Sequence, residues 1–344
     1  MGGGSRIGAA AAAVALLLSI GGCSAGQHAP GRPNYPAYAT LPARTADPHF
    51  VAAIDAAHAH GLRVWLESNL VAKWRAGRPQ FDAAIEQLAA LSQRPGVVGV
   101  KIADELGDHD GLNRQDIMAF LRDARAALHA NAPGKLVLID IIGYELGCAP
   151  DLPQVSTSAA RCMASERQAH PAVTLATLDR IMRSGYLDVV DLSTNIAAPD
   201  VYASWGITRA QAQRAAFAEA ARRGWTRDVR LQTRKALAFP TPDVPDAQTA
   251  AALVPDFIDV PLAAGARAVD VWTYNQLYRG ALVHLIGPGL TTNALWSALE
   301  KRKRAGATLF THYSPTFPLG SDVDADMQTI STAFTDVFCA AGTG

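Results

Sequence analysis

Short apolar runs rich in β-branched residues alternate with helical patterns along most of the chain, and this alternation restricts the fold more than any other feature. Strands and helices that alternate in one chain predict a parallel sheet covered by helices. Eight such units in a chain of this length favour a sheet that closes into a barrel. The expected strands are residues 36–41, 63–68, 97–104, 136–142, 188–194, 229–234, 266–273 and 308–313.

The helical segments carry their own start and stop signals. Thr208 and Gln211 have the spacing of a capping box, and Gly224 ends the same helix. Pro255 and Pro261 interrupt the sixth helical region, because proline breaks the hydrogen-bond pattern of a helix. The last helix is expected over a set of apolar residues at helical spacing: Met327, Ile330, Phe334 and Phe338.

A single (β/α)8 TIM barrel, which is an α/β fold, is therefore expected over residues 36–344. The rival is an open doubly wound sheet, which binds nucleotides through a glycine-rich turn after its first strand. No such turn follows the first expected strand. The sequence shows no internal repeat and no second domain, so we expect one domain.

The first residues are typical of an export signal rather than of the fold. Arg6 precedes an apolar stretch over residues 9–18, which is short for a spanning helix, and Cys23 follows. This pattern predicts a lipoprotein signal peptide over residues 1–23, with Cys23 in the lipobox as the lipidated residue. An ordinary signal peptide is the alternative. Residues 24–35 are rich in Pro, Gly and polar residues and are expected to form a flexible tether. The protein is thus expected in the cell envelope, outside the cytoplasm and anchored to a membrane by lipid.

The charge of the chain is balanced, with 31 basic and 31 acidic residues. A nucleic-acid partner needs a basic surface, so this balance argues against nucleic-acid binding.

Two cysteines lie close together in one segment. An oxidising compartment favours a disulfide between Cys148 and Cys162, which would stiffen residues 144–171 as one wall of a cleft. Cys339 is then unpaired, although it could also be the partner of either of the other two.

Carboxylates stand at the ends of two expected strands. Asp104 and Glu105 end the third strand, and Glu67 ends the second. Active sites of such barrels lie at the carboxyl ends of the strands. Two carboxylates that face one ligand suit hydrolysis of a glycosidic bond, in which one group donates a proton and the other stays ionised. Strands two and three are neighbours, so we expect Glu105 as the general acid, Glu67 as its partner carboxylate and Asp104 beside them.

Amide and aromatic residues occupy comparable positions after other strands or in the following loops. Such groups can hold the hydroxyls and the apolar faces of a sugar. The expected substrate-binding residues are Asn69, Asn195, Tyr202, Trp205, Gln232, Trp272, Tyr274 and Asn275.

The segment GVVGVKIADELGD resembles the strand ending in an Asp-Glu pair in glycoside-hydrolase-like (β/α)8 barrels of secreted bacterial proteins. AAIDAAHAHGLRVWLES, VRLQTRKALAF and GARAVDVWTYNQ are similar to other parts of these barrels, in the same order along the chain. The resemblance implies an exported protein that acts on a poly- or oligosaccharide by carboxylate acid/base catalysis. Leu106 stands where the family often has Pro, and no acidic residue ends the strand that contains Gln232, where the commonest retaining glycosidases keep their nucleophile.

Other functions remain open from the sequence. The barrel could bind glycans without catalysis. A desolvated Lys101 could instead form a Schiff base and make the protein a lyase. His58 and His60 have a spacing seen in metal sites, but they fall in the last turn of a helix. We expect no metal and no cofactor. Three aspartates inside apolar runs are expected to be hydrogen-bonded supports, although one of them could be the second carboxylate: Asp140, Asp191 and Asp270.

Overall fold

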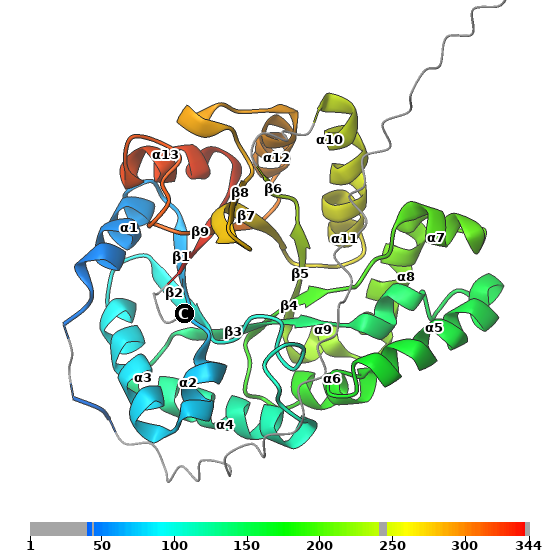
Figure 1. Cartoon of the computed structure of the whole chain (residues 1–344), viewed down its shortest axis with the longest axis horizontal. Coiled ribbons are helices and arrows are strands. Elements are labelled where there is room, and N and C mark those ends of the chain that lie inside the picture. Colours follow the sequence, from blue (N-terminus) through cyan, green and yellow to red (C-terminus); the bar gives the residue numbers. More distant parts are fainter. Residues whose placement is uncertain (1–39, 43–44, 241–245, 341–344) are drawn as a thin grey trace, which may run out of the picture. The chain divides into compact units, whose positions relative to one another are not determined.

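Eight parallel strands form a closed barrel in the computed structural model, which describes residues 40–42, 45–240 and 246–340. Neighbouring strands pair in parallel all the way round, and the pairing of β5 with β7 and of β10 with β1 completes the ring (Figure 1). The predicted (β/α)8 barrel is confirmed. In order around the barrel the strands are β1 (Arg63–Glu67), β2 (Val97–Lys101), β3 (Leu136–Ile142), β4 (Val189–Ser193), β5 (Arg230–Ala236), β7 (Val269–Tyr278), β9 (Leu309–Tyr313) and β10 (Asp336–Ala340).

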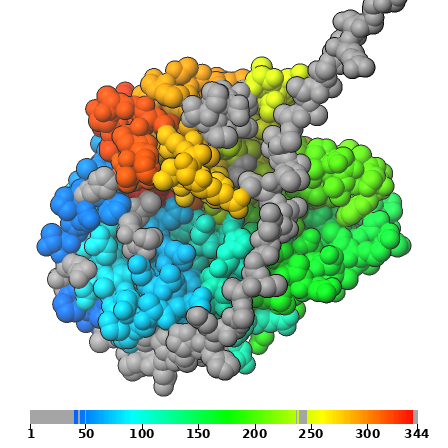
Figure 2. Space-filling model, viewed as in Figure 1, coloured from blue at the N-terminus to red at the C-terminus, as the bar shows by residue number. Residues whose placement is uncertain are grey.

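Helices surround the strands, and consecutive segments of the chain follow one another around the barrel so that the last elements lie beside the first (Figures 1 and 2). The helices are α1 (Pro48–Ala59), α2 (Leu70–Ala76), α3 (Arg78–Ser92), α4 (Arg114–Asn131), α5 (Ser156–Ala169), α6 (Leu175–Met182), α7 (Pro199–Ser204), α8 (Arg209–Arg222), α9 (Trp225–Asp228), α10 (Ala247–Val254), α11 (Val260–Ala263), α12 (Ala294–Arg304) and α13 (Val323–Ala333). Shorter turns are η1 (Tyr144–Cys148), η2 (Pro153–Val155), η3 (Pro255–Asp259) and η4 (Pro288–Leu290).

The predicted capping box at Thr208 and Gln211 begins α8, which confirms this start signal. The region with two prolines remains helical, because the π-helical turn η3 begins at Pro255 and α11 follows it. The end of β7 also forms an antiparallel hairpin with β8 (Ala281–His284), which pairs in turn with β6 (Phe239–Pro240). This hairpin was not predicted.

One strand of the barrel comes from the opposite end of the chain to that predicted. Thr40 and Leu41 are not in a strand, and residues 36–39 lie outside the described residues. The position beside β1 is taken by β10, which was predicted as the end of the last helix. That prediction was wrong because Phe338 continues the helical spacing of α13, although the helix ends at Ala333. The run Val337, Phe338 and Cys339 is equally consistent with a strand, in which successive side chains point to opposite faces.

An apolar layer fills the middle of the barrel. Its large rings come from Trp65, Phe310 and Phe338, whose centroids lie 5.5 to 6.2 Å apart. Gly99 leaves room for them, because a Cβ atom at this position would lie 2.3 Å from the ring of Trp65. The layer is thus a packed plug between the two ends of the barrel. Its buried members are Trp65, Leu138, Val189, Ala268, Phe310 and Phe338.

The predicted disulfide between Cys148 and Cys162 is present, with Cα atoms 5.6 Å apart. It joins η1 to α5, so much of the expected loop over residues 144–171 is helical. Cys339 is buried in β10 and forms no disulfide.

The predicted signal peptide, the lipobox Cys23 and the tether over residues 24–35 lie outside the described residues. Within the part that the structure describes, no helix has both the length and the apolar character needed to cross a bilayer.

Candidate active site

A layer of polar side chains lies directly above the apolar layer, toward the carboxyl ends of the strands. On most strands the polar residue stands two positions after the apolar one, as in Trp65 and Glu67 or Phe310 and His312. Residues two apart point to the same side of a strand, so the inward face of each strand contributes one residue to the apolar layer and the next to the polar layer. The fully buried members of the polar layer are Lys101, Asp140, Asp191, Gln232, Asp270 and His312.

Lys101 is an ion-paired centre of this layer. Its Nζ atom lies 2.8 Å from Glu67 Oε1 and 2.8 Å from Asp104 Oδ1. Burial alone would lower the pKa of Lys101, but the two carboxylates outweigh it and raise the pKa. The amine is therefore held protonated, whereas a Schiff base requires the neutral form.

Glu67 is engaged through both carboxylate oxygens. Its Oε2 atom lies 2.9 Å from Nδ1 of His312, and Nε2 of the same imidazole lies 2.9 Å from Asp270 Oδ2. Burial opposes ionisation of Glu67, but the charges of His312 and Lys101 dominate and lower its pKa to about 2. The pKa of His312 is raised by Asp270 and Glu67 against the effect of its burial. Glu67 is thus fixed as an anion.

Arg234 connects the buried layer to the mouth of the barrel. Its guanidinium contacts Asp140, and its NH1 atom lies 3.0 Å from Asp104 Oδ1 and 3.9 Å from Glu105 Oε1. Burial lowers the pKa of Arg234, while the surrounding carboxylates, Asp104 and Asp270 first, raise it overall. The carboxyl groups of Asp104 and Glu105 therefore both lie near the positive charge of Arg234.

Asp104 and Glu105 reach the solvent. Their side chains are 46% and 35% exposed, in contrast to the buried layer beneath them. Burial raises the pKa of Asp104, but Lys101 and Arg234 reverse this effect and lower it. Burial also raises the pKa of Glu105; Arg234 opposes the rise, and the negative charges of Asp104 and Asp108 add to it. Two adjacent carboxyls thus have pKa values shifted in opposite directions.

The backbone conformation of Glu105 explains why Asp104 and Glu105, although adjacent in sequence, have different surroundings. Glu105 has a φ of 46°, in the left-handed region, which turns the chain sharply at the end of β2. The amide of Leu106 then donates a hydrogen bond of 3.0 Å to the carbonyl of Asp140 on the next strand. This turn sends the Asp104 side chain toward Lys101 and leaves Glu105 further out.

A wall of aromatic and acidic groups stands beside Glu105. The rings of Tyr144 and His170 are stacked with centroids 3.4 Å apart. Nδ1 of His170 lies 3.0 Å from Asp108 Oδ1, and Nε2 of His109 lies 2.6 Å from Asp108 Oδ2. Tyr144 begins η1 and His170 follows α5, so the disulfide-linked segment forms this wall.

Glu105, Asp108 and His109 each place one possible ligand atom within 4.8 Å of the others. These are the residues that could hold a cation. Both oxygens of Asp108 already contact imidazoles, however, so these ion pairs explain the position of Asp108 without a bound cation.

Some of the predicted substrate-binding residues lie where a ligand could reach them. Asn69 and Asn195 are exposed after β1 and β4. Trp272 and Trp205 are partly exposed, and the Trp272 indole donates a hydrogen bond of 2.7 Å to Gln276. Gln232 is different, because it is fully buried next to Asp191 in the register of β4 and β5.

Three other predicted residues bind the protein itself. The buried Tyr274 hydroxyl donates to Asp326 at 2.8 Å, on the helical side of β7. Asn275 bonds to the backbone of Ser314. The buried Tyr202 hydroxyl donates to the carbonyl of Gly147 at 2.7 Å. We leave Tyr274, Asn275 and Tyr202 out of the proposed site.

Arg234, His312, Tyr144 and His170 complete the arrangement and were not among the predicted site residues. Parity along the strands was the available signal for two of them, because Arg234 follows Gln232 and His312 follows Phe310 by two positions. Tyr144 and His170 lie in a long connection between strands, for which alternation gives no signal.

No protein family matches the chain, and no curated protein matches it in sequence. Among solved structures, it is similar to the carboxyl transferase domain from Rhizobium etli pyruvate carboxylase with pyruvate and biocytin, at 9% identity and a TM-score of 0.43, covering 90% of this chain and 46% of that chain. The same domain with pyruvate gives 11% identity and a TM-score of 0.42, with the same coverage. The chain thus spans less than half the length of these structures. Neither structure is described as a glycosidase, and no family match supports the glycoside-hydrolase assignment.

Proposed function

We propose that the protein is a glycoside hydrolase that acts on a poly- or oligosaccharide, with Glu105 as the general acid and Asp104 as the ionised carboxylate. One observation carries this proposal. Two adjacent, solvent-exposed carboxyls at the mouth of the barrel have pKa values shifted in opposite directions. An acid that keeps its proton beside a carboxylate that stays ionised is the pair that this reaction requires.

The geometry suits the mechanism. Asp104 Oδ1 and Glu105 Oε1 lie 3.0 Å and 3.9 Å from the same nitrogen of Arg234, so these oxygens are no more than about 7 Å apart and can face one ligand. Glu105 would protonate the leaving oxygen, while Asp104 would attack the sugar or activate water. Glu67 takes a different role from the one expected, since both of its oxygens are engaged: it positions Asp104 through Lys101.

Some of the exposed or partly exposed residues expected to bind substrate suit a sugar. Trp272 and Trp205 offer ring faces for the apolar side of a pyranose, and Asn69 and Asn195 offer amides for its hydroxyls.

The test is the pH dependence of hydrolysis on a panel of envelope and plant polysaccharides. A bell-shaped profile is expected, because the rate falls at low pH as Asp104 gains a proton and at high pH as Glu105 loses one. Glu105→Gln should lower kcat by roughly 10²- to 10⁴-fold and abolish the alkaline limb. Glu300→Gln on α12 is the matched control and should leave the profile unchanged. Equal activity in Glu105→Gln and wild type would contradict the proposal.

A glycan-binding protein without catalysis is the second candidate. The full engagement of Glu67 favours it, because this carboxylate is withdrawn from direct chemistry. Saccharide binding that persists in the wild type with no turnover on any substrate would establish this alternative.

We also propose export and lipid anchoring through Cys23. Metabolic labelling with a radioactive fatty acid tests this directly. Label is expected in the wild-type protein and not in Cys23→Ala. Label in both chains would rule out Cys23 as the lipidated residue.

A further inference from the structure

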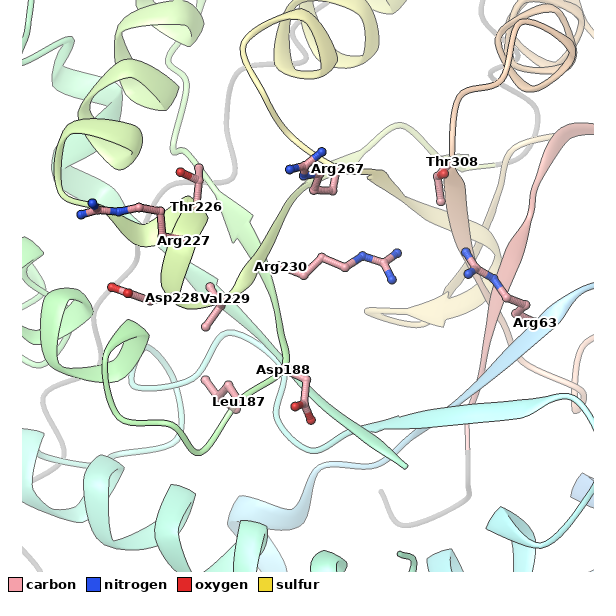
Figure 3. Close-up of a pocket in the computed structure, with 10 residues that line it drawn as sticks. All are labelled: Arg63, Leu187, Asp188, Thr226, Arg227, Asp228, Val229, Arg230, Arg267 and Thr308. Carbon is pink, nitrogen blue, oxygen red and sulfur yellow. The ribbon is translucent and has the colours of Figure 1, made fainter. Parts of the chain in front are cut away.

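A cavity opens at the end of the barrel where the strands begin, opposite to Asp104 and Glu105. Its volume is about 660 Å³, which is within the size range of small-molecule sites. The apolar layer of Trp65, Phe310 and Phe338 separates it from Asp104 and Glu105. The residues that line it, shown in Figure 3, are Arg63, Leu187, Asp188, Thr226, Arg227, Asp228, Val229, Arg230, Arg267 and Thr308.

The two carboxylates of the lining are already paired with arginines outside it. Asp188 binds Arg125, and it also accepts a hydrogen bond from a backbone amide of β3. Asp228 lies 3.9 Å from Arg183. The acidic residues therefore do little to neutralise the arginines that face the cavity.

The four arginines of the lining give the cavity a net positive charge. Arg63 is paired with the buried Asp336 at 2.7 Å. Among the described residues, no carboxylate lies within ion-pair distance of Arg227, Arg230 or Arg267. Arg230 thus retains its hydrogen-bonding capacity for a ligand, whereas the guanidinium group of Arg227 points away from Arg230 and Arg63 (Figure 3).

Arg230 and Arg63 extend toward one another across the end of the barrel (Figure 3). Burial lowers the pKa of Arg230, and the nearby charge of Arg63 lowers it further, although Asp336 partly compensates. Two like charges that face each other repel, and an anion between them would relieve the repulsion.

We propose that this cavity binds a phosphate group, held between the guanidinium groups of Arg230 and Arg63. Guanidinium groups present paired N–H donors that match the oxygens of phosphate. Thr226 and Thr308 add hydroxyl donors in the same lining, and Arg267 adds a further positive charge. The site is separate from the proposed hydrolytic site and does not depend on it.

Isothermal titration of the full chain with sodium pyrophosphate tests the proposal. Binding is expected to weaken as sodium chloride is added, because salt screens the attraction. Arg230→Gln should weaken binding by at least about tenfold, and Arg230→Lys by less, since lysine keeps the charge but not the paired donors. Arg161→Gln on the exposed side of α5 is the matched control and should bind as the wild type does.

A urea unfolding curve shows whether Arg230→Gln remains folded; if it does not, the exposed Arg267→Gln replaces it with the same expectation. Vesicles of phosphatidylglycerol, compared with phosphatidylcholine, distinguish a lipid headgroup from a soluble phosphate, with Cys23→Ala as the background chain so that no anchor contributes. Binding to either source that requires Arg230 supports the phosphate site and identifies its source. Absence of binding to both, or wild-type binding in folded Arg230→Gln and Arg267→Gln, overturns it.

Discussion

The Nζ atom of Lys101 lies 2.8 Å from Oε1 of Glu67, so an ion pair crosses between adjacent strands inside the barrel. Lys101 also holds Asp104, and Glu67 also holds His312. These contacts form one network that links the barrel interior to Asp104 and holds this carboxylate in place at the mouth.

Removing one partner of this ion pair should be strongly destabilising, because it leaves the other charge buried without compensation. Lys101→Met is expected to lower the free energy of unfolding by about 3–5 kcal/mol. In Lys101→Met/Glu67→Gln the loss should be clearly smaller than the sum of the two single losses. Urea unfolding of all four chains measures the coupling, and strictly additive losses would show that the pair contributes nothing specific.

Stability in acid should depend on Glu67. Its pKa in the folded protein is about 2, below the ordinary value of 4.5. A carboxyl whose pKa falls on folding stabilises the protein above the ordinary value, and this contribution is lost as the pH drops from 4.5 toward 2. The amount is at most about 3 kcal/mol. Unfolding free energies measured across this pH range should fall less steeply in Glu67→Gln than in the wild type, whereas Glu300→Gln should follow the wild type.

The disulfide should stabilise the wall beside Glu105. It closes a loop with a sequence separation of 14, for which chain entropy predicts about 3 kcal/mol. Cys148→Ser/Cys162→Ser should unfold at a correspondingly lower urea concentration than the oxidised wild type. Dithiothreitol should shift the wild type toward the variant and leave the variant unchanged; a shift of the variant by the reductant would point to another cause.

Phe338 should be a core residue of the barrel. It is fully buried between Trp65 and Phe310, so Phe338→Ala is expected to cost about 3–5 kcal/mol of unfolding free energy. Leu277→Ala, at a position 50% exposed on β7, is the control and should cost within about 0.5 kcal/mol. Equal effects of both substitutions would argue against the strand β10.

Most of the fold could be predicted from alternation alone, since each buried parallel strand is a short apolar run between helical patterns. The last strand could not, because Phe334 and Phe338 satisfy helical spacing as well as they satisfy a helix end followed by a strand. Only the pairing with β1 and β9 decides between these, and pairing is a long-range property.

The candidate site was predictable where strand parity is regular. Glu67 and Lys101 point inward, as expected from alternation on adjacent strands. Tyr274 does not follow this rule, because the register between β7 and β9 shifts between Val271 and Asn275 and the alternation is interrupted there. The opposite pKa shifts required the structure, because burial raises the pKa of Glu105, whereas Lys101 and the sequence-distant Arg234 lower the pKa of Asp104.

The position of β10 next to β1 has a consequence for how the molecule acquires its shape. During synthesis on the ribosome, β1 is made before the other strands of the barrel, whereas its neighbour β10 is made after all of them. Until then the sheet has two open edges, which are available for pairing with other chains. The barrel therefore cannot close before β10 has been made, and a chain released before Asp336 would be prone to aggregate.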